Sequence, residues 1–391
     1  MRWELTADQE MVRDMVREFV DAEVVPMAGE WDRAKRFPSE VFRQLGELGM
    51  FGMVIPEEWG GAGLDGITYC LALEEIARGD ASTCVAISVT NSVYAAPIMK
   101  FGTDEQRERF LRPAASGEWL GAFCLSEPEA GSDAAAIKVR AIRKGDEYVL
   151  NGPKAWVTNG SVAGALLVFA VTDPGDPRSA TAFLVPREHP GVAVLHAEEK
   201  MGLRSSVTNQ INFEDCVVPA TFRLGEEGQG LKIALDSLDG GRAGIAAQAV
   251  GIARGAYEAG RDYLLERVAF GRPLATFEGL RHGVARMATE IHAARLLYLR
   301  AAAQRDSGER NTRAASIAKL FATEMANRTA YQALQFHGGY GYVTDYPVER
   351  FYRDARVTTI YEGTSEIQRL VIAREELARA TRLAEARAAR G

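Results

Sequence analysis

The spacing of apolar residues divides the chain into three zones. In residues 1–118 apolar side chains recur at helical spacing. Residues 119–228 instead hold short strand-like runs such as EYVLNG, ALLVFAV, TAFLVP and NQINF, separated by turn clusters such as DPGDPRS. From residue 229 to the end, helical spacing returns in long, small-residue-rich stretches. The predicted order is therefore α, then β, then α.

Capping signals place two helices in the first zone. Thr6 and Gln9 form a capping-box pattern in front of an apolar run at helical spacing. Pro26 is expected to end that helix, because proline lacks the backbone donor that a helix interior needs. Thr103 and Gln106 form a second capping box, which predicts a helix at RERFL.

The other two zones predict a fold class. The middle runs are typical of a small antiparallel barrel or sandwich. The last zone has helical stretches at 231–270, 277–306 and 312–336, and a final one that begins near Thr364; four such helices suggest a bundle. Because strands and helices do not alternate, a parallel-sheet nucleotide fold is disfavoured. The fold class is α+β with several domains.

One glycine motif is interpreted as a decoy. Gly61, Gly63 and Gly66 spell GxGxxG, which alone would suggest a dinucleotide site. That site needs a preceding buried strand, whereas this motif follows PEEW within the helical zone. We expect a connecting loop.

Composition narrows the possible functions. At roughly 150 residues per domain, 391 residues predict two or three domains. With 47% hydrophobic residues the chain is expected to fold, and a net charge of −7 argues against nucleic-acid or anionic-membrane partners. Residues 81–99 are too polar for a transmembrane helix, and the N-terminus has no apolar signal run. The four cysteines are scattered and the histidines lack metal-site spacing, so we expect a cytoplasmic protein without a metal.

Two segments of the middle zone carry candidate chemistry. In FCLSEPEAGSD, Gly131 and Ser132 lie at a bend whose backbone N–H groups and hydroxyl could hold phosphate oxygens. In KAWVTNG, Trp156 and Thr158 are two apart and share one face of a strand, where they could flank a flat heteroaromatic cofactor. From the residues alone, a strand-to-loop junction and a core tryptophan are the commoner interpretations.

Two segments of the last zone also carry candidate chemistry. Asp239 and Arg242, three apart on a helix, form either a surface ion pair or a pair that meets a polar ligand head. Glu362 precedes a helix that Thr364 or Ser365 can cap, SEIQ fitting a capping box. The helix N-terminus would favour the ionised carboxylate of Glu362, whereas burial would raise the pKa of Glu362. The two effects together could make Glu362 a base near neutral pH. The alternative is an ordinary glutamate at the start of a helix.

Taken together, five segments resemble the acyl-CoA dehydrogenase family over essentially the whole chain. They are LSEPEAGSD, KAWVTNG, RVAFGRPL, LQFHGGYGYVTDYPVERFYRDAR and IYEGTSEIQR, in this order. The likeness is greatest to the short-chain, butyryl-type members. The resemblance implies an all-α N-terminal domain (1–118), a β-barrel-like middle domain (119–228) and a C-terminal four-helix bundle (229–391).

The resemblance also implies a reaction. Glu362 would remove the α-proton of a short- to medium-chain acyl-CoA, and the β-hydrogen would leave as a hydride to N5 of FAD, giving a trans-2-enoyl-CoA. Electrons would pass to an electron-transfer flavoprotein, and the protein would be a homo-oligomer, usually a dimer of dimers. One alternative is an acyl-CoA oxidase, which is disfavoured because the additional C-terminal domain of the larger oxidases is not found in this sequence. The other is a flavin-bearing nucleic-acid-binding relative, which the net charge of −7 disfavours.

Site residues follow from matching positions in the family. The resemblance implies cofactor contacts at Phe123, Leu125, Ser126, Gly131, Ser132, Trp156, Thr158, Thr364 and Glu366. It implies contacts to the FAD of a neighbouring subunit at Arg267, Phe270, Gln335 and Gly339. It implies substrate contacts at Ser132, Asp239, Arg242, Tyr361 and Gly363.

Two positions refine the comparison. Some members carry the base on the long helix just before the arginine of the CoA-binding pair, but here that position is Gly241, which cannot serve. Many members have Phe-Gln where this chain has Phe277–Glu278, and an acidic side chain is unfavourable near a cofactor phosphate. A cofactor contact by Glu278 is therefore left open.

Overall fold

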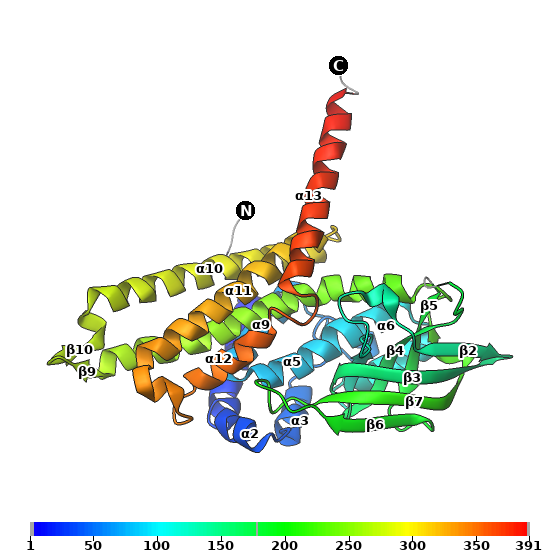
Figure 1. The fold of residues 1–391 in the computed structure, drawn as a ribbon, viewed down its shortest axis with the longest axis horizontal. Coiled ribbons are helices and arrows are strands. Elements are labelled where there is room, and N and C mark those ends of the chain that lie inside the picture. The colour runs from blue at the N-terminus through cyan, green and yellow to red at the C-terminus, as the bar shows by residue number, and fades with distance from the viewer. Residues whose placement is uncertain (1–3, 177–178, 389–391) are drawn as a thin grey trace.

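A computed structural model describes residues 4–176 and 179–388. A β-sheet occupies one end of the molecule, and long helices run from it to the opposite end (Figure 1). Pro177 and Arg178, which belong to the predicted DPGDPRS turn, lie outside the described residues.

The N-terminal zone is helical, as predicted. Both capping boxes are confirmed: the Gln9 amide donates to Thr6 Oγ1 at 3.2 Å, and the Gln106 amide donates to Thr103 Oγ1 at 3.3 Å. The first helix continues as a π-helical turn and ends before Pro26. The helices are α1 (Ala7–Phe19), α2 (Ala28–Ala34), α3 (Ser39–Glu47), α4 (Gly66–Gly79), α5 (Ala81–Val89), α6 (Ala96–Phe101), α7 (Asp104–Gln106) and α8 (Arg112–Ala115), with π-helical turns at Val20–Val24, Thr90–Ala95 and Arg107–Leu111 and a 3₁₀ turn at Glu57–Trp59.

One described helical stretch, Ala81–Phe101, is long and apolar enough to cross a membrane by length and composition. Inside the protein, 78% of its most apolar window is buried. Its apolar side chains are therefore already covered by the fold.

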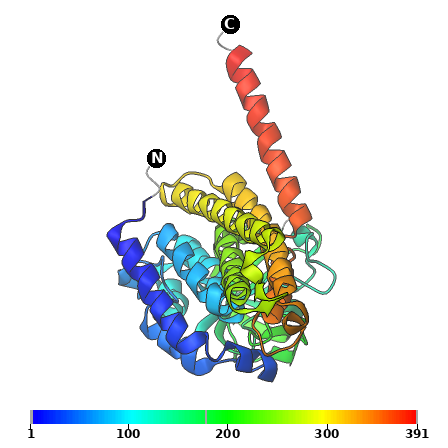
Figure 2. The ribbon, with the colours of Figure 1, turned by 90° about the vertical axis from the view of Figure 1, so that its left-hand side faces the viewer.

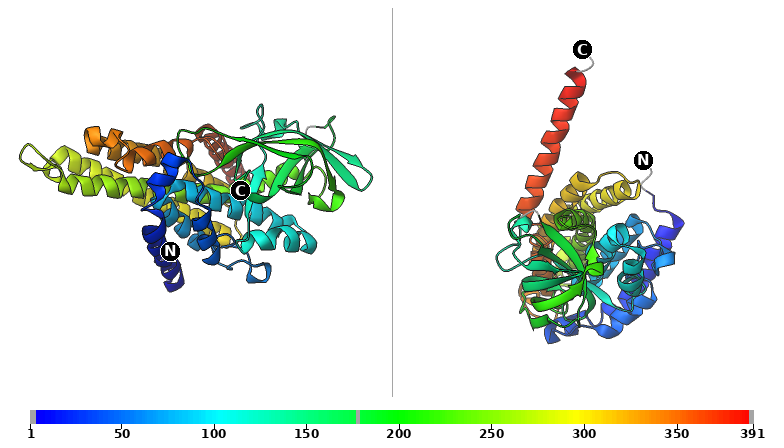
Figure 3. Two further views of the ribbon diagram at one scale, coloured as in Figure 1. Left: turned by 90° about the horizontal axis from the view of Figure 1, so that it is seen from below. Right: turned by 90° about the vertical axis from the view of Figure 1, so that its right-hand side faces the viewer.

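The middle zone forms one eight-stranded sheet with the order β6-β7-β3-β2-β4-β5-β8, in which β1 also pairs with β4 (Figure 3, right). The antiparallel expectation holds for most neighbours, but β1 runs parallel to β4 and β2 meets β4 in parallel at Arg140 and Val171. Local alternation marks a strand without giving its direction relative to a distant partner. The strands are β1 (Leu120–Cys124), β2 (Arg140–Lys144), β3 (Glu147–Thr158), β4 (Ala163–Val171), β5 (Ala180–Pro186), β6 (Val192–Ala197), β7 (Thr208–Pro219) and β8 (Arg223–Leu224).

The last zone contains the predicted long helices and one that was not predicted. Three long helices, α9, α10 and α11, pack together, and α4 packs against α9. The final helix, α13, contacts α11 near the start of α13 and then projects from the body, with Leu370 and Leu377 exposed (Figures 1 and 2). The short α12 was not predicted. The elements are α9 (Gly230–Glu266), the hairpin of β9 (Val268–Ala269) and β10 (Arg272–Pro273), α10 (Glu278–Asp306), α11 (Thr312–His337), α12 (Val348–Val357) and α13 (Ser365–Ala388).

The GxGxxG segment is a connecting loop, as predicted. Gly61 and Gly63 lie between the 3₁₀ turn at Glu57–Trp59 and α4, and Gly66 begins α4, so no strand precedes the motif in the described chain. A side chain at Gly61 would collide with the carbonyl oxygen of Ile55, which explains the glycine by close packing.

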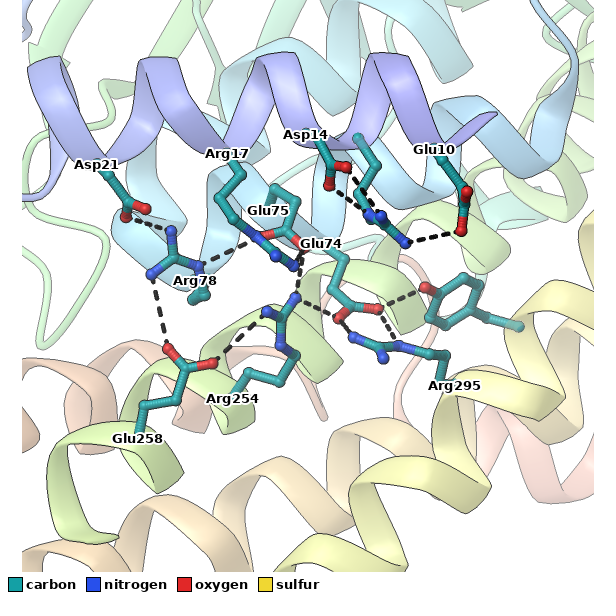
Figure 4. A network of polar contacts seen from close by, with 12 residues as sticks. Glu10, Asp14, Arg17, Asp21, Glu74, Glu75, Arg78, Arg254, Glu258 and Arg295 are labelled. Carbon is teal, nitrogen blue, oxygen red and sulfur yellow. Dashed lines mark hydrogen bonds and ion pairs between the residues drawn. The ribbon is translucent and has the colours of Figure 1, made fainter. Parts of the chain in front are cut away.

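A buried network of charges joins the N-terminal helices to the C-terminal ones (Figure 4). Glu74 and Glu75 of α4 are each 1% exposed. Arg254 of α9 donates to both carboxylates at 2.7 Å, while Arg295 of α10 pairs with Glu74 and Arg17 of α1 with Glu75. These pairs link four helices, α1, α4, α9 and α10.

Candidate active site

The candidate base lies in a turn between α12 and α13. Glu362 has φ 49° and Gly363 has φ 89°, so two successive residues are left-handed, and for glutamate this conformation is uncommon. The preceding Tyr361 donates its hydroxyl to Gln248 Oε1 of α9 at 2.5 Å. The turn is therefore anchored to the long helix.

Two side chains hold the carbonyl groups of this turn. Lys319 of α11 donates from Nζ to the Gly363 oxygen at 2.8 Å. Gln368 of α13 donates from Nε2 to the same oxygen at 3.0 Å and to the Glu362 oxygen at 3.3 Å. The turn that carries Glu362 is thus fixed from two helices.

The cap of α13 is made by one of the two predicted residues. The Ile367 amide donates to Thr364 Oγ1 at 3.3 Å. The alternative SEIQ capping box is not formed, because Ser365 Oγ donates to Glu324 at 2.7 Å and Gln368 turns back to the preceding turn.

The Glu362 carboxylate is shielded but unpaired. Its Oε2 atom is buried without a hydrogen-bond partner. Burial raises the pKa of Glu362 to about 7, against the opposing charges of Lys319 and Arg242. The space for Oε2 exists because residue 241 is glycine: a Cβ there would lie 3.1 Å from Glu362 Cδ and closer still to Oε2.

The predicted contact between Asp239 and Arg242 is confirmed as an ion pair on α9. It is not a surface pair, since Arg242 is 5% exposed. The Asp239 carboxylate also accepts from Thr312 Oγ1 at 2.6 Å, and Arg242 Nη1 lies 3.5 Å from Ser316 Oγ. Arg242 Nε is buried without a partner, so this guanidinium retains a free donor beside the carboxylate of Glu362.

The segment FCLSEPEAGSD continues from β1 into an exposed bend. Phe123 packs its ring 5.0 Å from Phe169, and Leu125 is buried. Ser126 is half-buried, and Gly131 and Ser132 are exposed. A side chain at Gly131 would meet no atom within 4 Å, so the backbone there is open to a ligand.

A buried ion pair, which the sequence analysis missed, supports this bend. Glu127 accepts hydrogen bonds from the Lys138 amide at 2.6 Å, the Val139 amide at 3.0 Å and Lys154 Nζ at 2.7 Å. Lys154 also donates to the Leu125 oxygen at 3.0 Å, and its side chain is 0% exposed. The loop is therefore held by a charge pair inside the sheet.

Trp156 and Thr158 lie together on the open face of β3. The pairing of β3 with β7 shifts register between Lys154 and Val157, and Trp156 has φ 59° in this irregular stretch. Trp156 is 64% exposed and Thr158 is half-buried, with Val157 buried between them. A large exposed aromatic ring held in strained backbone is suited to a flat ligand.

A second group of predicted cofactor residues lies at the end of the molecule opposite the sheet. Arg267 and Phe270 belong to the β9–β10 hairpin region, and Gln335 and Gly339 lie at the end of α11 (Figure 1). Phe270 is 94% exposed with φ 52°, and the other three are also exposed. One chain therefore does not bring this group and the bend after β1 to the same place.

The remaining predicted residues line the first turn of α13. Thr364 and Glu366 border a hollow of about 300 Å³ whose walls also include Arg356 of α12 and Glu324 of α11.

Glu278, whose contact was left open, begins α10 with its side chain 86% exposed, 3.7 Å from His282. Among the described residues, no cluster of three or more His, Cys, Asp or Glu side chains could hold a metal ion.

Lys319 was also missed by the sequence analysis. It lies within AASIAKLFA, where alanines occupy the core-facing positions of α11. A lysine at the same helical spacing as buried alanines was the available signal, because lysine is almost never fully buried without a partner.

Comparisons with known proteins agree with this architecture. Family models match all three zones: the acyl-CoA dehydrogenase N-terminal domain at residues 6–118, the middle domain at 122–216 and the C-terminal domain at 228–377. The mitochondrial short-chain specific acyl-CoA dehydrogenase of Rattus norvegicus is 47% identical over 95% of this chain and 90% of that protein.

Solved structures extend the likeness to the fold. Butyryl-CoA dehydrogenase from Megasphaera elsdenii is 41% identical, covers 96% of this chain and 100% of its own, and has a TM-score of 0.95. A chain from a study of the electron transferring flavoprotein of Acidaminococcus fermentans has the same coverage and TM-score at 44% identity. A glutaryl-CoA dehydrogenase from Mycobacterium smegmatis in complex with FADH2 is 32% identical, covers 95% of each chain and has a TM-score of 0.91. The chain belongs to the acyl-CoA dehydrogenase family.

Proposed function

We propose that this protein is an FAD-dependent dehydrogenase that converts a short-chain acyl-CoA to the trans-2-enoyl-CoA, with Glu362 as the base that removes the α-proton. The observation that carries the proposal is the unpaired, buried Oε2 of Glu362, a carboxylate on which the charge of the buried Arg242 acts. The likeness to short-chain and butyryl-CoA dehydrogenases supports the substrate class.

The protonation state of Glu362 suits a base. With a pKa of about 7, the carboxylate is about half ionised at neutral pH and its conjugate acid is weak enough to keep the proton it takes. The Glu362 amide, which has no acceptor in the described chain, is available to the thioester carbonyl oxygen as negative charge develops there. Exclusion of water would strengthen both contacts.

The ion pair on α9 would hold the polar part of the substrate. Arg242 retains an unpaired donor at Nε, and Asp239 fixes the guanidinium from the same helix. Tyr361 and Gly363 flank the base, and Ser132 lies exposed in the bend after β1. These five residues are the proposed substrate contacts.

The open face of the middle zone fits FAD. The exposed ring of Trp156, with Thr158 beside it, suits the flavin ring, and the bend from Phe123 to Ser132 offers an open backbone held by the Lys154–Glu127 pair. Leu125, Ser126, Gly131, Thr364 and Glu366 complete the proposed contacts of the same subunit. When bound, FAD supplies the acceptor for the β-hydrogen as a hydride.

The second group of cofactor residues supports an assembly of several copies. The residues of this group are exposed around the β9–β10 hairpin and the end of α11, and they would contact the FAD of a neighbouring subunit: Arg267, Phe270, Gln335 and Gly339. We therefore include a homo-oligomer, a dimer of dimers, in the proposal. An electron-transfer flavoprotein as acceptor and a cytoplasmic location complete it.

Three domains with boundaries near residues 118 and 228 belong to the same proposal. The first strand of the sheet begins at Leu120, the last ends at Leu224, and α9 begins at Gly230. The acyl-CoA site would then lie where all three meet.

Anaerobic bleaching of the flavin by acyl-CoA thioesters of increasing chain length tests the proposal. A butyryl thioester should bleach the purified holoenzyme fastest, and Glu362→Gln should slow bleaching by about 10²–10⁴-fold. Glu40→Gln, on the exposed side of α3, is the matched control and should bleach as wild type does. Wild-type bleaching by Glu362→Gln would overturn the base, a preference for long chains would overturn the substrate class, and reoxidation in air within the turnover time would favour an oxidase.

A further inference from the structure

Lys319 is a buried cation without a carboxylate partner. Its side chain is fully buried in α11, and its hydrogen bond goes to a neutral group, from Nζ to the Gly363 carbonyl oxygen at 2.8 Å. Burying an ammonium group is costly unless it is paired, so a lysine at this position needs a reason. Burial lowers the pKa of Lys319 to about 8, and the largest opposing effect on this pKa is the charge of Glu362.

The polar face of α11 points at the candidate base. Thr312, Ser316 and Lys319 are spaced four and three residues apart, so they share one face of the helix. Thr312 contacts Asp239, Ser316 contacts Arg242, and Lys319 contacts the residue that follows Glu362. This face is continuous from the ion pair on α9 to the turn.

We propose that Lys319 is a positioning residue for the dehydrogenation: its hydrogen bond to Gly363 holds the left-handed turn that carries Glu362, and its charge favours the ionised form of the Glu362 carboxylate without pairing with it. This inference rests on the proposed function, because it takes Glu362 to be the base. It assigns to Lys319 no contact with substrate or cofactor.

The surroundings of Glu362 identify which groups could act in this way. The cations that face it are Lys319 from α11 and Arg242 from α9, and Tyr69 of α4 and the adjacent Tyr361 are neutral, because burial raises the pKa of both phenols. Around Lys319 the charged groups are Glu362, Arg242, Glu324 and Glu366. Arg242 is paired with Asp239, so Lys319 is the one of these two cations without a carboxylate partner.

A neighbouring residue separates the two effects of Lys319. Gln368 donates to the same Gly363 oxygen at 3.0 Å, but it is neutral. Replacement of Gln368 by Met removes a hydrogen bond from the turn and leaves the charge near Glu362 unchanged. Replacement of Lys319 by Met removes both.

The test is the pH dependence of anaerobic flavin bleaching by butyryl-CoA in holoenzyme variants. For Lys319→Met, the pKa of the acid limb should rise by about one unit, because a nearby opposite charge lowers a carboxyl pKa by about 1–3 units. A rise from about 7 to about 8 reduces the ionised fraction at pH 7 about fivefold. The maximal rate should fall further because the turn loosens, whereas the KM for butyryl-CoA should change little.

For Gln368→Met, we expect a lower maximal rate with an unshifted acid limb. Arg295→Met, which removes a half-buried cation from the buried carboxylate of Glu74, serves as the control for loss of a paired cation elsewhere: the melting temperature should fall with no shift of the acid limb. The Glu362 carboxyl stretch in infrared difference spectra should titrate with the same upward shift in Lys319→Met, independently of turnover.

The outcomes distinguish this inference from the proposed function. If Lys319→Met keeps the wild-type acid limb and maximal rate while Glu362→Gln is inactive, Lys319 is only structural and the base assignment stands. If Glu362→Gln bleaches normally, the base assignment itself fails. If Lys319→Met does not fold, two measurements on Gln368→Met take its place: the infrared titration of the Glu362 carboxyl and the maximal rate of bleaching. A wild-type maximal rate in Gln368→Met overturns the role of the turn.

Discussion

The smallest informative change at this site adds one carbon atom, in Gly241→Ala. A Cβ on Gly241 would lie 3.1 Å from Glu362 Cδ and 3.3 Å from Oε1, with Oε2 closer still, whereas ordinary contact begins at 3.4 Å. The carboxylate must therefore move by about 1 Å, and a misplacement of that size costs about 10²-fold in rate. Alanine also favours a helix interior over glycine by about 1 kcal/mol, so the protein should not lose stability.

This prediction separates geometry from folding, because rate and stability should move in opposite directions. The rate of anaerobic bleaching by butyryl-CoA in a stopped-flow instrument measures the first, and the melting temperature measures the second. Gly29→Ala in α2 is the matched control, since its Cβ would meet only Arg33 at 3.5 Å, and its bleaching rate should be unchanged. If Gly241→Ala bleaches within threefold of wild type, or loses rate only as it loses stability, the close fit of Glu362 against α9 is not what sets the reaction geometry.

Three further changes test two charged groups and one exposed aromatic ring. Glu362→Gln should stabilise the protein at pH 8 by up to about 3 kcal/mol and have little effect at pH 4.5 or below. The pKa of Glu362 in the folded state, about 7, exceeds the ordinary 4.5, so wild type loses stability as the pH rises from 4.5 through 7. Chemical unfolding of both proteins at the two pH values measures the difference. Lys154→Met should destabilise by about 3–5 kcal/mol, because it leaves the buried Glu127 carboxylate without its cation, and the variant should release FAD at lower urea than wild type. Phe270→Ala should leave the unfolding of the single chain nearly unchanged, since the ring is 94% exposed, but should weaken FAD retention if the hairpin serves a neighbouring subunit; equal retention in a dilution series would contradict that role.

Sequence reasoning succeeded where the relevant partners are close in the chain. The capping boxes of Thr6 and Thr103 and the pairing of Asp239 with Arg242 depend on spacings of three residues, which helix geometry fixes. The contact of Lys319 with Gly363 spans 44 residues, and no local pattern encodes it.

The same limit applies to the sheet and to the last helix. The sequence shows that 120–124 is apolar, but its parallel pairing with β4 depends on residues more than 40 positions later. Helical spacing predicts α13, yet it does not show what covers Leu377, which the chain leaves 70% exposed.

The arrangement of cations explains how a buried carboxylate stays both ionisable and reactive. A direct bond from Lys319 to Glu362 would favour the carboxylate strongly and depress its pKa, which would make it a weak base. The structure instead directs Lys319 to the Gly363 carbonyl and Arg242 to Asp239, so that both charges act on Glu362 through space while Oε2 remains unpaired. Burial raises the pKa of Glu362, the two cations limit the rise to about 7, and in the proposed reaction the unpaired Oε2 would take the proton of the substrate. A site built from direct salt bridges to Glu362 would hold the charge equally well but would offer a weaker proton acceptor.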